Sequence, residues 1–187
     1  MTPVAQINHV DSGLPRWLIN TAFICCLVSA VVSNYVPWEH WSSEHLPFVI
    51  ALMQITDIVL FVAIMRGMRS LPHSLGWLWW MLIAIDFAGF VCTALQGVFP
   101  VLEEVRVITA AMLLLAYLPL GVSLLLWYRG RLAQTGLWMI IYILVLVILP
   151  VVFALTGILG NSTVSLALDI FCMIVNIVFL ITLRRVL

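Results

Sequence analysis

The chain has 187 residues, of which 65% are hydrophobic and only 9% are charged. Soluble domains carry about 25% charged residues and about half apolar ones, so this composition excludes an ordinary water-soluble globule. The formal net charge is zero, which gives no reason to expect nucleic acid or another charged polymer as a partner. A mean hydropathy of +1.22 indicates instead that much of the surface faces lipid.

Apolar stretches of about 20 residues recur along the chain, each long enough to cross a ~30 Å hydrocarbon core as a helix. They lie near residues 16–36, 46–66, 75–98, 105–127, 136–158 and 163–183. The links between them are too short to hold a soluble domain. We therefore predict an all-α, polytopic membrane protein with six transmembrane helices, in which residues 1–187 form a single integral membrane domain.

The arginines predict the orientation of these helices. One side receives Arg16, Arg66, Arg69, Arg129, Arg131, Arg184 and Arg185, whereas Arg106 alone lies on the other. Because cytoplasmic ends of membrane helices carry an excess of basic residues, both termini are predicted to be cytoplasmic. The expected location is the cytoplasmic (inner) membrane of a bacterium.

The outer link between the first two predicted helices reads VPWEHWSSEHLPF, residues 36–48. Its charged and titratable positions are Glu39, His40, Glu44 and His45. Trp38 and Trp41 fit the aromatic belt at a membrane surface, so we favour interfacial packing at an outer mouth. A pH-sensing or cation-attracting role stays open. A metal site is the least favoured reading, because a spacing of five does not put both histidines on one helical face.

Three aspartates lie inside predicted helices, where each costs about 2.5–3.5 kcal/mol on insertion scales. At 1.5 Å per residue, Asp57 lies roughly 13 Å and Asp86 roughly 17 Å from the cytoplasmic helix ends. The two helices are joined by a short link, so the carboxyls are predicted to lie at similar depth on neighbouring helices. Asp169 lies about 22 Å up, nearer the outer face.

Further polar side chains share a helical face with these aspartates. The predicted pathway-lining residues are Gln54, Thr93, Asp169 and Asn176. Polar stripes of this kind normally face a bundle interior or a wet cavity rather than lipid. The alternative is that they only hold helices together through hydrogen bonds.

No Arg, Lys or His lies in the central part of any predicted helix, so the aspartates have no basic partner. Each can be held protonated because burial disfavours the charged form, two can share one proton, or they can hold a cation. All three alternatives point to proton or cation chemistry. Asp57 and Asp86 are therefore the predicted proton- or cation-binding site.

Three functions fit this pattern. The first is a small transporter or channel, the second a non-catalytic subunit that anchors partner membrane proteins, and the third an intramembrane aspartyl hydrolase. Sequence motifs for nucleotide, haem or metal chemistry are missing, so we expect no cofactor, no metal and no catalytic residue of those kinds. The expected partners are the lipid bilayer and a proton or monovalent cation, with a second copy or a partner membrane subunit left open.

Overall fold

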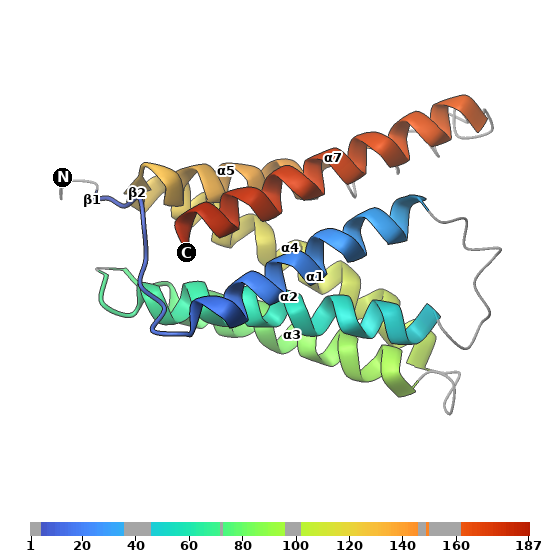
Figure 1. Ribbon diagram of the computed structural model, residues 1–187, viewed down its shortest axis with the longest axis horizontal. Helices are drawn as coiled ribbons and strands as arrows, with labels where there is room; N and C mark the ends of the chain where they lie inside the picture. The colour runs from blue at the N-terminus through green and yellow to red at the C-terminus, as the bar shows by residue number, and fades with distance from the viewer. Residues whose placement is uncertain (1–4, 36–45, 72, 96–101, 146–148, 150–161) are drawn as a thin grey trace.

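The computed structural model describes residues 5–35, 46–71, 73–95, 102–145, 149 and 162–187 (Figure 1). Within this part of the chain 84% of the residues are helical, which confirms the predicted all-α class. The helices are α1 (Arg16–Tyr35), α2 (Leu46–Met68), α3 (Gly76–Leu95), α4 (Leu102–Trp127), α5 (Arg131–Ile143) and α7 (Ser162–Val186). All but α5 lie close to their predicted ranges.

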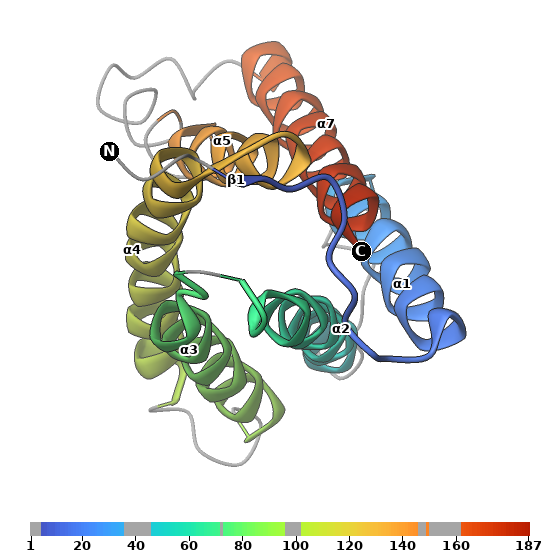
Figure 2. The ribbon, with the colours of Figure 1, turned by 90° about the vertical axis from the view of Figure 1, so that its left-hand side faces the viewer.

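The helices form a closed ring when viewed along their length (Figure 2). Each helix packs against its neighbours in the chain, and α7 packs against α1 to close the ring. Short connections favour antiparallel neighbours of this kind. As a result, the starts of α1, α3 and α5 and the ends of α2, α4 and α7 lie at one end of the ring, which also holds most of the arginines and is called the arginine end below.

Aromatic side chains fill the interior of the ring. Phe61 of α2 and Tyr117 of α4 meet edge to face, with ring centroids 5.9 Å apart. Tyr117 also contacts Tyr142 of α5 at 5.6 Å and Phe179 of α7 at 6.0 Å. Such pairs contribute about 0.5–1.5 kcal/mol beyond the area they bury. This aromatic cluster connects helices that are not neighbours around the ring.

The segment before α1 closes the arginine end. Its β1 (Ala5–Gln6) pairs in parallel with β2 (Tyr128–Arg129), which follows α4. The Val10 N–H then donates to the Val186 carbonyl at the end of α7, at 2.8 Å. Val10 is buried, and it packs so tightly on α2 that a Cβ added at Gly67 would lie 2.8 Å from the Val10 Cβ. The segment thus ties together three separate parts of the ring.

The start of α5 differs from the predicted range 136–158. The helix begins at Arg131, directly after a turn in which Gly130 has a φ of +79°. The Arg131 N–H points to the Asn8 side-chain oxygen at 3.4 Å. The docked N-terminal segment therefore helps to start this helix, and the apolar run that follows does not mark its beginning.

Large apolar side chains cover the outward faces of the helices. On α4 the exposed ones include Ile108, Met112, Leu115, Val122 and Leu126. Two helices of the described part, Gly76–Leu95 and Leu166–Val186, are long and apolar enough to cross a membrane by length and composition. The prediction of six transmembrane helices goes beyond this finding.

The contact between α4 and α5 depends on two glycines. A Cβ added at Gly121 would lie 2.8 Å from the Gly136 carbonyl oxygen, and one added at Gly136 would lie 2.6 Å from the Gly121 oxygen. Small residues allow membrane helices to approach this closely. Neither position has room for a methyl group without separating the helices.

We expect Gly121→Ala to lower the free energy of unfolding by about 1–3 kcal/mol, because the added methyl forces the two backbones apart. Unfolding of the purified protein in detergent, followed by circular dichroism, measures the change. Gly76→Ala is the matched control, since a Cβ there would meet nothing closer than Ser74 Oγ at 3.8 Å. Equal stability of the two variants would contradict the close contact.

Candidate functional site

The carboxyl of Asp57 is held by a thiol from the neighbouring helix. Cys26 of α1 donates from Sγ to Asp57 Oδ1 at 3.1 Å. Cys26 is buried because it belongs to the inward stripe of α1, which also includes Ala22 and Ala30. Asp57 is half-buried as a residue, and its carboxyl points into the interior toward Cys26.

Asp86 is buried, with only 4% of its surface exposed. It lies on the inward face of α3, where Ile83 and Gly89 are buried at the flanking turns. Its Oδ2 atom is buried and has no hydrogen-bond partner in the described part of the chain. A buried oxygen that stays unpaired costs about 1–3 kcal/mol, so this position suits a polar species such as water or a cation.

The structure brings the two carboxyls close enough for their charges to interact. Asp57 and Asp86 come from α2 and α3, which pack together as a hairpin. No basic side chain among the described residues contributes to the electrostatics of either carboxyl. At 1.5 Å per residue, Arg66 lies roughly 13 Å along α2 from Asp57.

Polar groups from the other helices surround the pair. The hydroxyls of Tyr117 and Tyr142 both interact electrostatically with Asp57 and Asp86, and Tyr142 also interacts with Cys172 of α7. We call this set the interior polar cluster: Cys26, Asp57, Asp86, Tyr117, Tyr142 and Cys172. Each of the helices described contributes one member, so the cluster lies where the whole ring converges.

The structure describes the side chains of only some of the predicted pathway-lining residues. Thr93 is fully buried on the face of α3 that carries Asp86, and its hydroxyl donates to the Gly89 carbonyl at 2.9 Å. Asn176 is partly buried on α7. The side chains of Gln54 and Asp169 lie outside the described part, although both residues belong to helices. The outer-mouth positions Glu39, His40, Glu44 and His45 also lie outside the described residues.

The tyrosines and cysteines of the cluster were missed in the sequence. Cys26 and Cys172 lie within apolar runs and were interpreted as small hydrophobic residues. Tyr117 and Tyr142 carry a clearer signal, because tyrosine in a membrane helix normally lies at the interface rather than in the middle. Tyr117, in the middle of its predicted helix, could therefore have indicated a polar interior.

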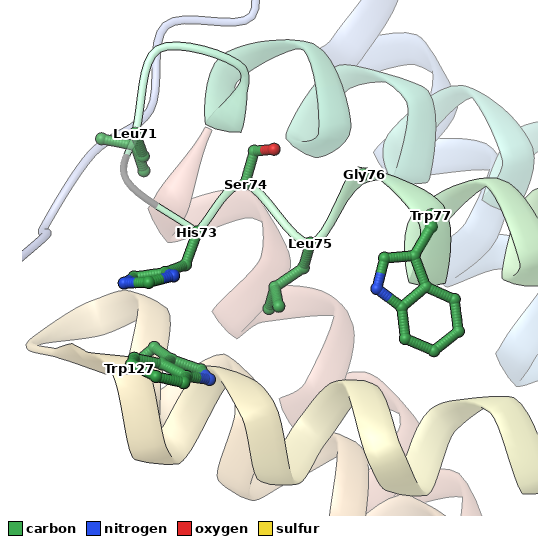
Figure 3. Close-up of a pocket in the computed structure, with 7 residues that line it drawn as sticks. All are labelled: Leu71, His73, Ser74, Leu75, Gly76, Trp77 and Trp127. Atoms are coloured by element: carbon green, nitrogen blue, oxygen red, sulfur yellow. The ribbon is translucent and has the colours of Figure 1, made fainter.

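A hollow, separate from the interior polar cluster, lies at the arginine end, at the link between α2 and α3 (Figure 3). It has a volume of about 630 Å³ and is open to its surroundings. The His73 ring stacks on Trp127 with centroids 4.1 Å apart, and the Tyr128 hydroxyl donates to the His73 carbonyl at 2.7 Å. Its exposed Trp77 suits a position at a membrane surface. None of its lining residues belongs to the interior polar cluster.

Neither a metal-binding cluster among the described residues nor a similarity to known proteins indicates the function, which leaves the chemistry of the interior polar cluster. Among the residues the structure describes, no group of three or more His, Cys, Asp or Glu side chains is arranged to hold a metal ion. No family model matches the chain, and no curated protein or solved structure matches it.

We expect Asp86→Ala to raise the free energy of unfolding by about 1 kcal/mol or more, because it removes a buried oxygen without a partner. Thr93→Ala is the matched control on the same face of α3. It removes a hydroxyl that is hydrogen-bonded, so it should lower the free energy of unfolding by about 1 kcal/mol. Chemical unfolding in detergent compares the two. A clear loss of stability in Asp86→Ala would mean that the carboxyl is a structural hydrogen-bonding group.

Proposed function

We propose that the protein is a small membrane transporter or channel in which Asp57 and Asp86 bind a proton or a monovalent cation. The observation that carries this proposal is the buried Asp86 carboxyl, whose charge interacts with that of Asp57 while no basic side chain among the described residues contributes to either carboxyl. A buried carboxylate without a basic partner is costly in its charged form. A bound proton or cation neutralises that charge.

Two carboxyls whose charges interact in the interior of a helix ring can bind a proton or a cation and release it again. Burial and the negative charge of its neighbour both make an uncompensated charge on Asp86 unfavourable. Cys26 fixes the orientation of Asp57 through its hydrogen bond.

The remaining predicted residues extend this site into a route. Thr93 shares the buried face of α3 with Asp86, which supports its place beside the path. Gln54, Asp169 and Asn176 complete the proposed lining. Glu39, His40, Glu44 and His45 form the proposed outer mouth, where acidic side chains would concentrate cations.

A membrane location of six spans is part of the proposal. Four exposed tryptophans lie at the arginine end: Trp17, Trp77, Trp80 and Trp127. Tryptophan gathers at the membrane–water interface, and basic residues gather on its cytoplasmic side. Together with the apolar outward faces, this supports a bundle whose arginine end is cytoplasmic, in the inner membrane of a bacterium.

Two other functions rank below this one. In a non-catalytic subunit the interior polar cluster would serve only to join helices, a role that does not need two interacting carboxyls without a basic partner among the described residues. An intramembrane aspartyl hydrolase would also use two neighbouring carboxyls. There the pair must approach a scissile carbonyl, whereas Asp57 is already held by Cys26 and Asp86 is almost fully enclosed.

We expect Asp57→Asn and Asp86→Asn each to reduce proton or cation flux at least about tenfold, because an amide neither releases a proton at neutral pH nor carries the charge that binds a cation. The protein is reconstituted in liposomes loaded with a pH-sensitive dye, and flux is driven by a potassium or sodium gradient. Asp11→Asn is the matched control. Asp11 is exposed and accepts the Gly13 N–H through Oδ1, an oxygen that asparagine retains.

Normal flux in both cluster variants would contradict the proposal. So would wild-type liposomes that pass neither protons, sodium nor potassium. Cleavage of a labelled lipid or peptide that depends on both aspartates would instead establish the hydrolase. A stoichiometric partner chain that co-purifies with an inactive wild-type protein would establish the subunit.

The orientation can be tested with single cysteines in a variant whose four native cysteines are replaced by alanine. Ser70→Cys lies exposed in the link after α2, at the arginine end. We expect it to react with a membrane-impermeant maleimide only after the cells are lysed, because this end is proposed to be cytoplasmic. Ser43→Cys, in the predicted outer link, should react in intact spheroplasts. The reverse labelling pattern would contradict the orientation.

A further inference from the structure

A hollow of about 440 Å³ at the arginine end is lined mainly by cationic side chains. It is lined by His9, Arg16, Ile19, Arg131, Arg184, Arg185 and Leu187, and we call it the arginine pocket. These residues come from the N-terminal segment, the starts of α1 and α5 and the end of α7. Figure 2 looks onto this end of the ring, where α7 passes beside α1. The pocket is remote from the interior polar cluster and shares no residue with it.

The docked N-terminal segment builds the pocket. On one side of His9, the Ile7 N–H donates to the Arg129 carbonyl at 3.0 Å. On the other side, the Val10 N–H donates to the Val186 carbonyl at 2.8 Å. These two bonds fix His9 between the start of α5 and the end of α7. The arrangement is therefore part of the fold rather than a chance meeting of surface side chains.

Neutral acceptors hold two of the arginines in place. Arg184 donates from Nε and Nη2 to Asn20 Oδ1, at 3.0 and 2.7 Å. Arg131 donates from Nη1 to the Arg185 carbonyl at 3.2 Å. An amide and a carbonyl orient a guanidinium without neutralising it. The positive charge of both groups therefore remains available.

No acidic side chain lines the arginine pocket among the residues described. Nor does the described structure give a hydrogen bond from the guanidinium of Arg16 or Arg185. Four guanidinium groups around one hollow repel one another, and each is a planar fork of N–H donors. Such an arrangement favours an anion that accepts several hydrogen bonds at once, and phosphate oxygens match this fork geometry.

We infer that the arginine pocket binds a phosphate group, either in the headgroup of an anionic phospholipid or in a soluble phosphate. The exposed Trp17 beside Arg16 suits a pocket close to a membrane surface. Bound phosphate bridges α1, α5, α7 and the N-terminal segment, which are the parts that meet where the ring closes. Its binding therefore stabilises the closed ring, independently of any transport through Asp57 and Asp86.

The test compares two double variants with the same loss of charge. Arg16→Gln/Arg185→Gln removes two pocket guanidiniums, and Arg66→Gln/Arg69→Gln removes two from the same end outside the pocket. Calorimetric titration with inorganic phosphate measures the soluble source. Native mass spectrometry after incubation with phosphatidylglycerol, and with phosphatidylcholine as the zwitterionic reference, measures the lipid source.

We expect at least one of these anionic probes to bind the wild type, and the pocket variant to bind it about tenfold more weakly, as the loss of a charge-assisted hydrogen bond implies. The control variant should stay within about twofold of the wild type, which is the scale expected of exposed, screened charges. Phosphate binding alone identifies a soluble ligand, and phosphatidylglycerol binding alone identifies a lipid; each supports the inference.

Wild-type protein that binds neither inorganic phosphate nor phosphatidylglycerol overturns the inference. An equal loss in the pocket and control variants overturns it too, because non-specific charge would then explain the binding. Circular dichroism checks that each variant is folded. If the double pocket variant does not fold, Arg16→Gln alone provides the same comparison against Arg66→Gln.

Discussion

Packing of aromatic rings inside the helix ring is the interaction on which the remaining structure depends. Aromatic pairs contribute about 0.5–1.5 kcal/mol each beyond the area they bury, and here they join helices that are not neighbours around the ring. Tyr117 lies at the centre of these contacts, since it touches Phe61, Tyr142 and Phe179 from three other helices. The same packing carries the tyrosine hydroxyls toward Asp57 and Asp86, so the interior polar cluster is a consequence of how the core is filled.

The helices themselves could be predicted because each is a long apolar run between polar links. The nearness of Asp57 and Asp86 could also be predicted, since a short link forces α2 and α3 into a hairpin and equal depth then brings the carboxyls together. The inward faces could not be predicted with equal certainty. These helices are apolar nearly all round, so their hydrophobic pattern does not show which face is inside. Cys26 therefore gave no sign that it would bind a carboxyl on α2.

The arginine end could be predicted only in part. The positions of the arginines predicted that most of them lie at one end of the helices. The docking of residues 5–15, however, depends on partners more than a hundred residues away, such as Tyr128 and Val186. The sequence of a short polar segment shows no periodicity that predicts such pairing. The early start of α5 has the same origin, because Asn8 and the turn at Gly130 lie at its first residue. The arginine pocket depends on these long-range bonds and was invisible for the same reason.

Two buried atoms make the inward face of α3 polar. Trp79 Nε1 and Asp86 Oδ2 are both buried without a hydrogen-bond partner in the part of the chain described. Both lie on the inward face of α3, about 10 Å apart along the helix axis, so each needs a partner of its own. One is a donor and the other an acceptor, and a buried water can serve either. Because an unpaired buried group costs about 1–3 kcal/mol, this face of α3 favours polar over apolar occupants.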